Sequence, residues 1–99
     1  MQISIQFVKM SESTSMRHYL EKKLEKLAKK YDWIIHARVY FKLEYNPSQK
    51  GKICEIELSV PGPRIFATSD ERNYEMAVKE TIQDLQKQLE KRKSNFIHH

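Results

Sequence analysis

Lysine and arginine side chains concentrated in two segments are the residues with the clearest chemistry in this sequence. Residues 17–30 hold six bases against two acids, and residues 87–93 hold four bases against one acid. Such side chains bind the phosphates of a polyanion without reading its bases. The net charge of +5 points only weakly to nucleic acid or an anionic membrane surface. The uneven distribution of the charge is therefore the more informative signal.

The basic segment at 87–93 also has a simpler interpretation. It ends the longest periodic stretch of the chain, residues 70–93, which has helical spacing of apolar residues. Residues 70–84 carry five acids against two bases, so the stretch begins negative and ends positive. A helix macrodipole favours that order. From this segment alone, a solvated helix end and a basic end that grips a polyanion explain the pattern equally well.

Residues that could support catalysis or bind a metal are scattered. Cys54 lies on the apolar face of a predicted strand, where a small buried hydrophobe is expected, and two glycines are too few for a phosphate-binding loop. Glu55 and Glu57 share a strand face, but cross-strand pairing with basic residues such as Arg38 and Lys42 explains them better than catalysis. The histidines lack metal-ligand spacing: His18, His36, His98 and His99. We therefore predict a protein that is not an enzyme and that uses no cofactor or metal.

Four strands and two helices are predicted to position the basic segments. The strands are expected at residues 2–8, 36–45, 52–60 and 64–69, and the helices at residues 14–31 and 70–93. The order β-α-β-β-β-α predicts an α+β fold in which two helices pack on one face of a four-stranded mixed sheet, with the first two strands parallel. The expected N-caps are Ser13 for the first helix and Ser69 or Asp70 for the second.

The faces of the predicted sheet differ in what they can bind. The inward face of the second strand is expected to be Ala37, Val39, Phe41, Leu43 and Tyr45, and Asn46-Pro47 opens the loop that follows. The open face offers only Tyr40 and Phe66 for stacking RNA bases, beside two glutamates, so it is a weak platform. The stronger candidates for phosphate binding are the lysines of the first helix: Lys22, Lys23, Lys26, Lys29 and Lys30.

The chain is expected to form a single domain over residues 1–99, ordered from about residue 2 to residue 93. One cysteine excludes an internal disulfide. The first residues do not follow a signal-peptide pattern, and no apolar run approaches the roughly 18–20 residues of a membrane span. We expect a cytoplasmic protein with no membrane partner.

Several segments taken in order resemble the short ribosome hibernation-promoting factor family, also called ribosome-associated inhibitors or the ribosomal subunit interface protein family. The segments are the opening strand MQISI, the helix MRHYLEKKLEKLAKKYDWI, the strand VYFKLEY, the strand-to-helix segment IFATSDERNYEMAV and the tail LQKQLEKRK. No one of them is diagnostic, and their order and spacing across the whole chain carry the resemblance. The run Asn73-Tyr74-Glu75-Met76 departs from the family, which often has Asp-Met-Tyr-Ala there.

The resemblance implies a fold similar to double-stranded RNA-binding domains and a non-enzymatic role on the ribosome. Family members bind ribosomal RNA in the messenger and transfer RNA channel of the small subunit, inhibit translation in stationary or stressed cells, and in some cases promote ribosome dimers. Lys42 matches a family position but lies on the predicted open face. The residues implied to contact RNA are Lys22, Lys23, Lys26, Lys87, Lys91, Arg92 and Lys93.

The lead hypothesis is therefore a ribosome hibernation factor whose partner is the small ribosomal subunit and its RNA. It is expected to be monomeric off the ribosome and to have no small-molecule substrate. The sequence shows neither the second, dimerising domain of long-form members nor the acidic tail of the inhibitor branch, so the short hibernation-promoting branch is the closer resemblance. The alternative hypothesis is a protein-interaction module that modulates a transcription factor.

Overall fold

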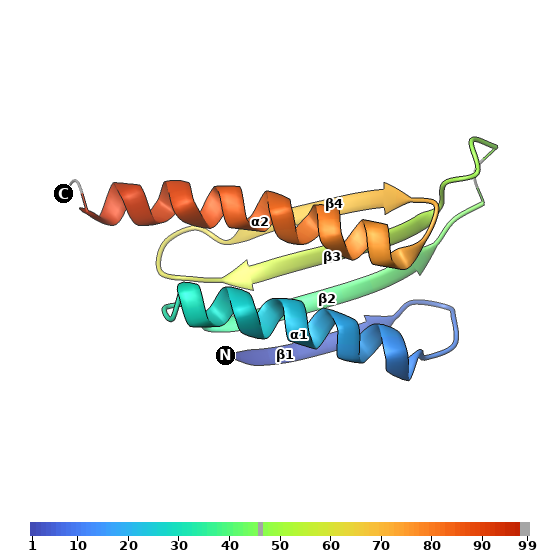
Figure 1. The fold of residues 1–99 in the computed structure, drawn as a ribbon, viewed down its shortest axis with the longest axis horizontal. Helices are drawn as coiled ribbons and strands as arrows, with labels where there is room; N and C mark the ends of the chain where they lie inside the picture. The colour runs from blue at the N-terminus through green and yellow to red at the C-terminus, as the bar shows by residue number, and fades with distance from the viewer. Residues whose placement is uncertain (46, 98–99) are drawn as a thin grey trace.

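The fold is a four-stranded mixed sheet with two helices on one face, as predicted (Figure 1). The computed structural model describes residues 1–45 and 47–97. Asn46, at the predicted loop opening, and the histidines His98 and His99 lie outside the described residues. The elements are β1 (Gln2–Phe7), α1 (Thr14–Lys30), β2 (His36–Leu43), β3 (Lys52–Ser59), β4 (Ile65–Glu71) and α2 (Tyr74–Ile97).

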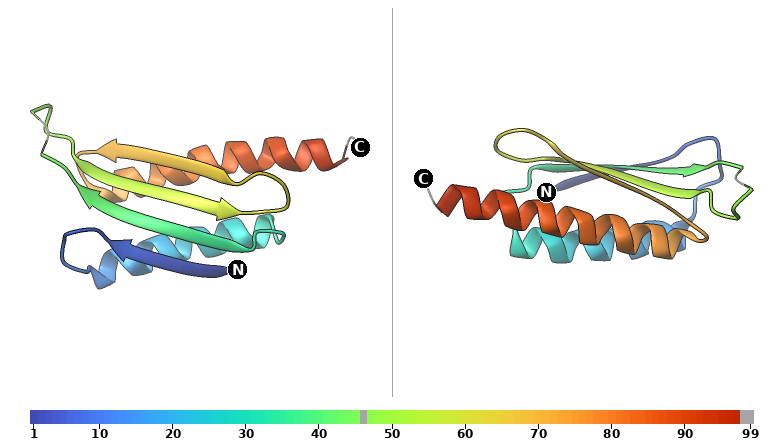
Figure 2. Two further views of the ribbon diagram at one scale, coloured as in Figure 1. Left: turned by 180° about the vertical axis from the view of Figure 1, so that it is seen from behind. Right: turned by 90° about the horizontal axis from the view of Figure 1, so that it is seen from above.

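The strands lie in the order β1-β2-β3-β4, so each strand pairs with its neighbour in sequence. β1 pairs with β2 in parallel, as α1 crosses over between them, and β2, β3 and β4 form the predicted antiparallel meander. Seen along the sheet, both helices lie on the same side of it (Figure 2). The other side of the sheet therefore has no helical cover within the described chain.

The core fills the space between the helices and the sheet. Leu20, Leu24 and Leu27 of α1 are buried, because their spacing places them on one face of the helix. The facing strands contribute the predicted alternating positions, and Thr81 is the polar member of the core. The Thr81 hydroxyl donates to the carbonyl oxygen of Ala77 at 2.7 Å, so this buried polar group is satisfied. The predicted N-cap Ser13 is confirmed, since its Oγ accepts from the amide of Met16.

The prediction for the start of the second helix is wrong. Neither Ser69 nor Asp70 caps α2, because β4 continues through both residues and pairs with β3 as far as Glu71. The Asp70 carboxylate instead accepts from the amide of Gly51 at 2.6 Å. Asn73 is the cap, since its Oδ1 accepts from the amide of Met76 at 2.8 Å. The acidic half of the helix is consequently shorter than expected.

The second strand buries less than predicted at its end. Leu43 is 57% exposed and Tyr45 is 98% exposed, although both continue the inward alternation. The helical cover stops short of them: Tyr74, the first residue of α2, packs its ring against Phe41 and donates its hydroxyl to the carbonyl of Lys42 at 2.8 Å. Beyond this contact the strand has no helix above it, so apolar side chains there stay in solvent.

Candidate nucleic-acid interface

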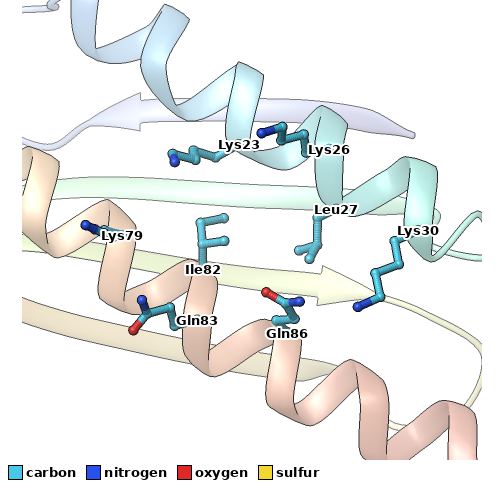
Figure 3. Close-up of a pocket in the computed structure, with 8 residues that line it drawn as sticks. All are labelled: Lys23, Lys26, Leu27, Lys30, Lys79, Ile82, Gln83 and Gln86. Atoms are coloured by element: carbon cyan, nitrogen blue, oxygen red, sulfur yellow. The ribbon is translucent and has the colours of Figure 1, made fainter.

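The two helices lie side by side and run in the same direction, so their C-terminal ends share one end of the molecule (Figures 1 and 2). A groove of about 380 Å³ lies between them. Its lining residues are Lys23, Lys26, Leu27 and Lys30 of α1 and Lys79, Ile82, Gln83 and Gln86 of α2. Leu27 and Ile82 point toward one another at its base, and Lys30 extends from α1 toward α2 (Figure 3).

Helical spacing puts lysines along this groove while leucines enter the core. Lys23, Lys26 and Lys30 follow one side of α1 at intervals of three and four residues, and the buried Leu20 and Leu24 lie on the neighbouring face. On α2, Lys79 precedes Gln83 and Gln86 at the same intervals. Among the described residues that line the groove, four are cationic and none is acidic. Such a row of like charges favours an extended polyanion as ligand.

A second depression, of about 290 Å³, continues the groove toward the C-terminal ends of the helices. It shares Lys30, Gln83 and Gln86 with the first and adds Lys87, Tyr31 and Glu90. We call the two depressions together the basic groove. Its lysines are Lys23, Lys26, Lys30, Lys79 and Lys87.

One carboxylate marks the C-terminal end of the basic groove. The buried Tyr31 donates its hydroxyl to Glu90 at 2.6 Å. This hydrogen bond lowers the pKa of Glu90, and the charges of Lys30 and Lys93 lower it further. Burial, followed by the contact with Glu90, raises the pKa of Tyr31 to about 12. Glu90 is therefore ionised and held in place by a neutral phenol, with the cations Lys30 and Lys93 nearby.

The structure brings only some of the predicted RNA-binding residues together. Lys23 and Lys26 line the basic groove, and Lys87 lines its continuation. Lys22 lies on the outer flank of α1, in a neighbouring depression that Lys29 lines as well and that shares Lys23 and Lys26 with the basic groove. Lys91 is exposed on the last turns of α2, where its neighbour Lys93 lies close enough to Glu90 to lower the pKa of that carboxyl.

Arg92 is directed elsewhere. It donates to the carbonyl oxygen of Pro61 at 2.9 Å, in the turn between β3 and β4. Its guanidinium lies so close to Gly62 that a Cβ there would be 3.1 Å from Nη1. Gly62 has a φ of +90°, a conformation that glycine adopts without strain. Arg92 thus ties this turn to α2, outside the basic groove.

Sequence reasoning missed one cation of the basic groove, Lys79, and named Lys30 as a phosphate-binding candidate of the first helix without placing it among the RNA contacts implied by the resemblance. Lys79 lies in the net-negative part of the C-terminal stretch, so its charge is hidden when charge is summed along the chain. Its position three residues before the buried Ile82 is the signal that could have found it, because residues with this spacing share a helix face. Gln83 and Gln86 were missed because they carry no charge and so do not enter a charge count.

The open face of the sheet carries paired charges. Lys42 forms an ion pair with Glu55, as predicted. Glu57 pairs with Arg64 at 3.0 Å, although Arg38 was an expected partner and lies opposite Glu57 in the strand register. Phe66 is 50% exposed on this face. Paired charges with few aromatic residues give weak attraction for phosphates or bases, in agreement with the sequence prediction.

Side chains suited to other chemistry are not assembled in the described part of the chain. Burial raises the pKa of the Cys54 thiol to about 12, which makes it a poor nucleophile. The described residues include no group of three or more side chains suited to hold a metal ion. None of the described helices is both long enough and apolar enough to cross a membrane.

Comparisons with protein families and with solved structures found similar proteins. A family model described as Sigma 54 modulation protein / S30EA ribosomal protein matches residues 3–96. The structure of a ribosomal subunit interface protein from Coxiella burnetii superposes with a TM-score of 0.82 at 26% identity, covering 95% of this chain and 99% of that one. The N-terminal domain of Protein Y from Thermus thermophilus superposes with a TM-score of 0.71 at 21% identity, covering 91% and 93%, which shows the shared fold. Among curated protein sequences, none matches this chain significantly.

Proposed function

Since the chain belongs to the Sigma 54 modulation protein / S30EA ribosomal protein family, we propose that it binds ribosomal RNA of the small subunit through the basic groove and inhibits translation. The family match confirms the resemblance found in the sequence. Proteins of this family are ribosome-associated regulators and not enzymes, which also agrees with the prediction for this chain. We place the protein in the cytoplasm with the ribosome.

The observation that carries the proposal is the row of five lysines between two parallel helices. Lys23, Lys26 and Lys30 of α1 and Lys79 and Lys87 of α2 line the basic groove, so an RNA backbone lying in it would meet cations from both helices. Lysine ammonium groups neutralise phosphates as point charges and carry little base specificity. Recognition would then follow the shape of the RNA, which suits a site formed by structured ribosomal RNA.

The predicted RNA-binding residues outside the basic groove have separate places in the proposal. We propose Lys22, Lys91 and Lys93 as contacts with RNA that reaches past the groove, because their side chains lie on the flank of α1 and on the last turns of α2. Arg92 donates to Pro61 through Nη1, so its other N–H groups are the ones that could contact RNA while that hydrogen bond is kept. We further propose that residues 1–99 act as one domain, that the target is the messenger and transfer RNA channel, and that inhibition takes place in stationary or stressed cells.

The direct test is sedimentation with purified ribosomal subunits, followed by in vitro translation with graded addition of the protein. We expect the protein to sediment with the small subunit at low salt and to reduce translation in proportion to its occupancy. A gradient of intact ribosomes also measures whether dimers form. Absence of the protein from small-subunit fractions at low salt would overturn the proposal. A partner that survives nuclease and high salt would support the alternative, modulation of a transcription factor through protein contacts.

A further inference from the structure

An aromatic pair lies where the basic groove ends. The ring centroid of Trp33, in the segment after α1, is 5.2 Å from that of Phe96 on the last turns of α2, and the two rings meet edge to face. Trp33 also meets the ring of Tyr31 at 5.8 Å, and Tyr31 lines the basic groove. We call Trp33 and Phe96 the aromatic ledge. It lies beside the C-terminal end of the basic groove, because the buried Tyr31 packs against Trp33 and borders that end of the groove.

The aromatic ledge leaves ring surface open to solvent. Phe96 is 41% exposed and Trp33 is partly exposed, whereas Tyr31 is fully buried. Phe96 lies seven residues beyond Leu89, the last buried apolar residue in the part of α2 whose side chains are described. This separation is about 10 Å along a helix axis. α2 reaches past the end of α1 there (Figures 1 and 2). The adjacent rings of Phe96 and Trp33 thus form a small exposed aromatic surface that a ligand could cover.

The charges around the aromatic ledge favour a nucleic acid as the ligand that covers its exposed rings. The ammonium group of Lys30 lies 5.5 Å from the centroid of the Tyr31 ring, and Lys87 lines the same depression. Glu90 opposes these cations locally, and Asp32 is exposed beside Trp33, but Lys30 and Lys93 lie close enough to Glu90 to lower its pKa. Aromatic side chains beside cations that track a backbone are the arrangement by which proteins stack unpaired bases.

We propose that the aromatic ledge stacks an unpaired base of the RNA strand whose phosphates lie in the basic groove. This inference rests on the proposed function and adds a contact of a different kind. The groove would hold the backbone by charge, and the aromatic ledge would hold one base by its ring face, without selecting its identity. A simpler role is a clasp that pins the last turns of α2 to the domain. A leucine at position 96 would preserve a clasp and remove the stacking surface.

The test compares Phe96→Leu with Phe66→Leu, the same change at an exposed phenylalanine on the open face of the sheet. The probes are a 12-nucleotide oligoadenylate RNA and an inorganic polyphosphate chain of equal charge, which has no bases. Trp33 is the one tryptophan of the sequence, so its fluorescence reports directly on the aromatic ledge. Circular dichroism melting checks that each variant keeps its fold.

We expect the RNA to quench Trp33 fluorescence more strongly than polyphosphate does at equal occupancy. Phe96→Leu should weaken RNA binding about 3- to 10-fold, a part of the effect seen when a whole stacking residue is removed. Its polyphosphate affinity and its slope of log affinity against log salt should stay at the wild-type values, because stacking releases no counterions. Phe66→Leu should change neither affinity.

Equal quenching by both probes, or unchanged RNA affinity in Phe96→Leu, would overturn the proposal. The aromatic ledge would then only pin the last turns of α2 to the domain. Weaker binding of Phe96→Leu to small subunits with unchanged oligoadenylate affinity would also overturn the proposal, in favour of contact with a ribosomal protein. In each of these cases wild-type protein still sediments with small subunits, so the proposed function stands. Failure of the wild type to sediment would instead remove the proposed function, and the inference with it.

Discussion

Neutralising one lysine on each side of the basic groove should change how ribosome binding responds to salt. The perturbation is Lys26→Gln with Lys79→Gln, which removes one charge from α1 and one from α2. Both side chains are exposed, and surface substitutions of this kind seldom change stability by more than about 0.5 kcal/mol. The matched control is Lys9→Gln with Arg72→Gln, which removes the same net charge from exposed positions outside the groove.

The expected magnitude follows from the number of cations in the groove. Each neutralised phosphate contributes about 0.7 to 0.9 to the slope of log affinity against log salt. If each of the five groove lysines neutralises one phosphate, the groove contributes about −3.5 to −4.5 to the wild-type slope, which is an affinity loss of about 100- to 500-fold between 50 and 200 mM salt. With three groove contacts left, the contribution of the groove is about −2.1 to −2.7 and the loss is about 20- to 40-fold.

The assay is equilibrium binding of labelled protein to purified small subunits at five or six salt concentrations. The slope is the decisive quantity, because a loss of folded protein lowers affinity at every salt concentration without changing the number of phosphate contacts. The groove variant should have the shallower slope and the control the wild-type slope. Equal slopes for the groove variant and the wild type, or an equally shallow slope for the control, would refute the assignment of phosphate contacts to the groove.

Two further predictions concern the structure that supports the groove. Tyr31→Phe should lower the free energy of unfolding at pH 7 by about 1 kcal/mol, through loss of the hydrogen bond to Glu90. Because the pKa of Glu90 is lowered in the folded state, this stabilisation is present above the ordinary carboxyl pKa and is lost as the pH falls through the lowered value. Urea unfolding at pH 7 and pH 3 should show the difference between the two proteins shrinking in acid, and a constant difference would contradict this reasoning. Asn73→Ala should cost about 1 kcal/mol in the same measurement, whereas Ser69→Ala should cost less, since Asn73 caps α2; the reverse order would restore the cap predicted from the sequence.

Much of the fold follows from short-range patterns. The alternation in residues 2–8 and 52–60 and the helical spacing around Leu20 and Leu24 identify their elements, because each needs one apolar face toward a common core. The boundary at residues 69–73 does not follow, because β4 is prolonged by pairing with β3, a contact between segments far apart in sequence. Residues with good capping chemistry, Ser69 and Asp70, are therefore used by a strand.

The candidate site was harder to predict from the sequence than the fold was. Charge counts found the segments that hold Lys23, Lys26 and Lys87, since these lie in locally basic runs. They missed Lys79 as a site residue, because its sequence neighbours are acidic and its groove partners lie on another helix. The family resemblance adds Arg92 to the RNA contacts, and the structure shows a hydrogen bond from Arg92 to Pro61 that the sequence did not predict. Which side chains of a helix line the groove depends on how that helix is rotated about its axis relative to its neighbour. Tertiary packing sets this rotation.

The one-sided placement of the helices also has a kinetic consequence. The lysines of the basic groove lie on the helical side of the sheet, while ion pairs such as Lys42 with Glu55 lie on the other. The molecule is therefore an electric dipole directed across its thickness. In the field of a polyanion such a dipole turns while it diffuses, so a larger share of collisions begins in the productive orientation. The arrangement should speed association and leave the sheet face outermost at first contact.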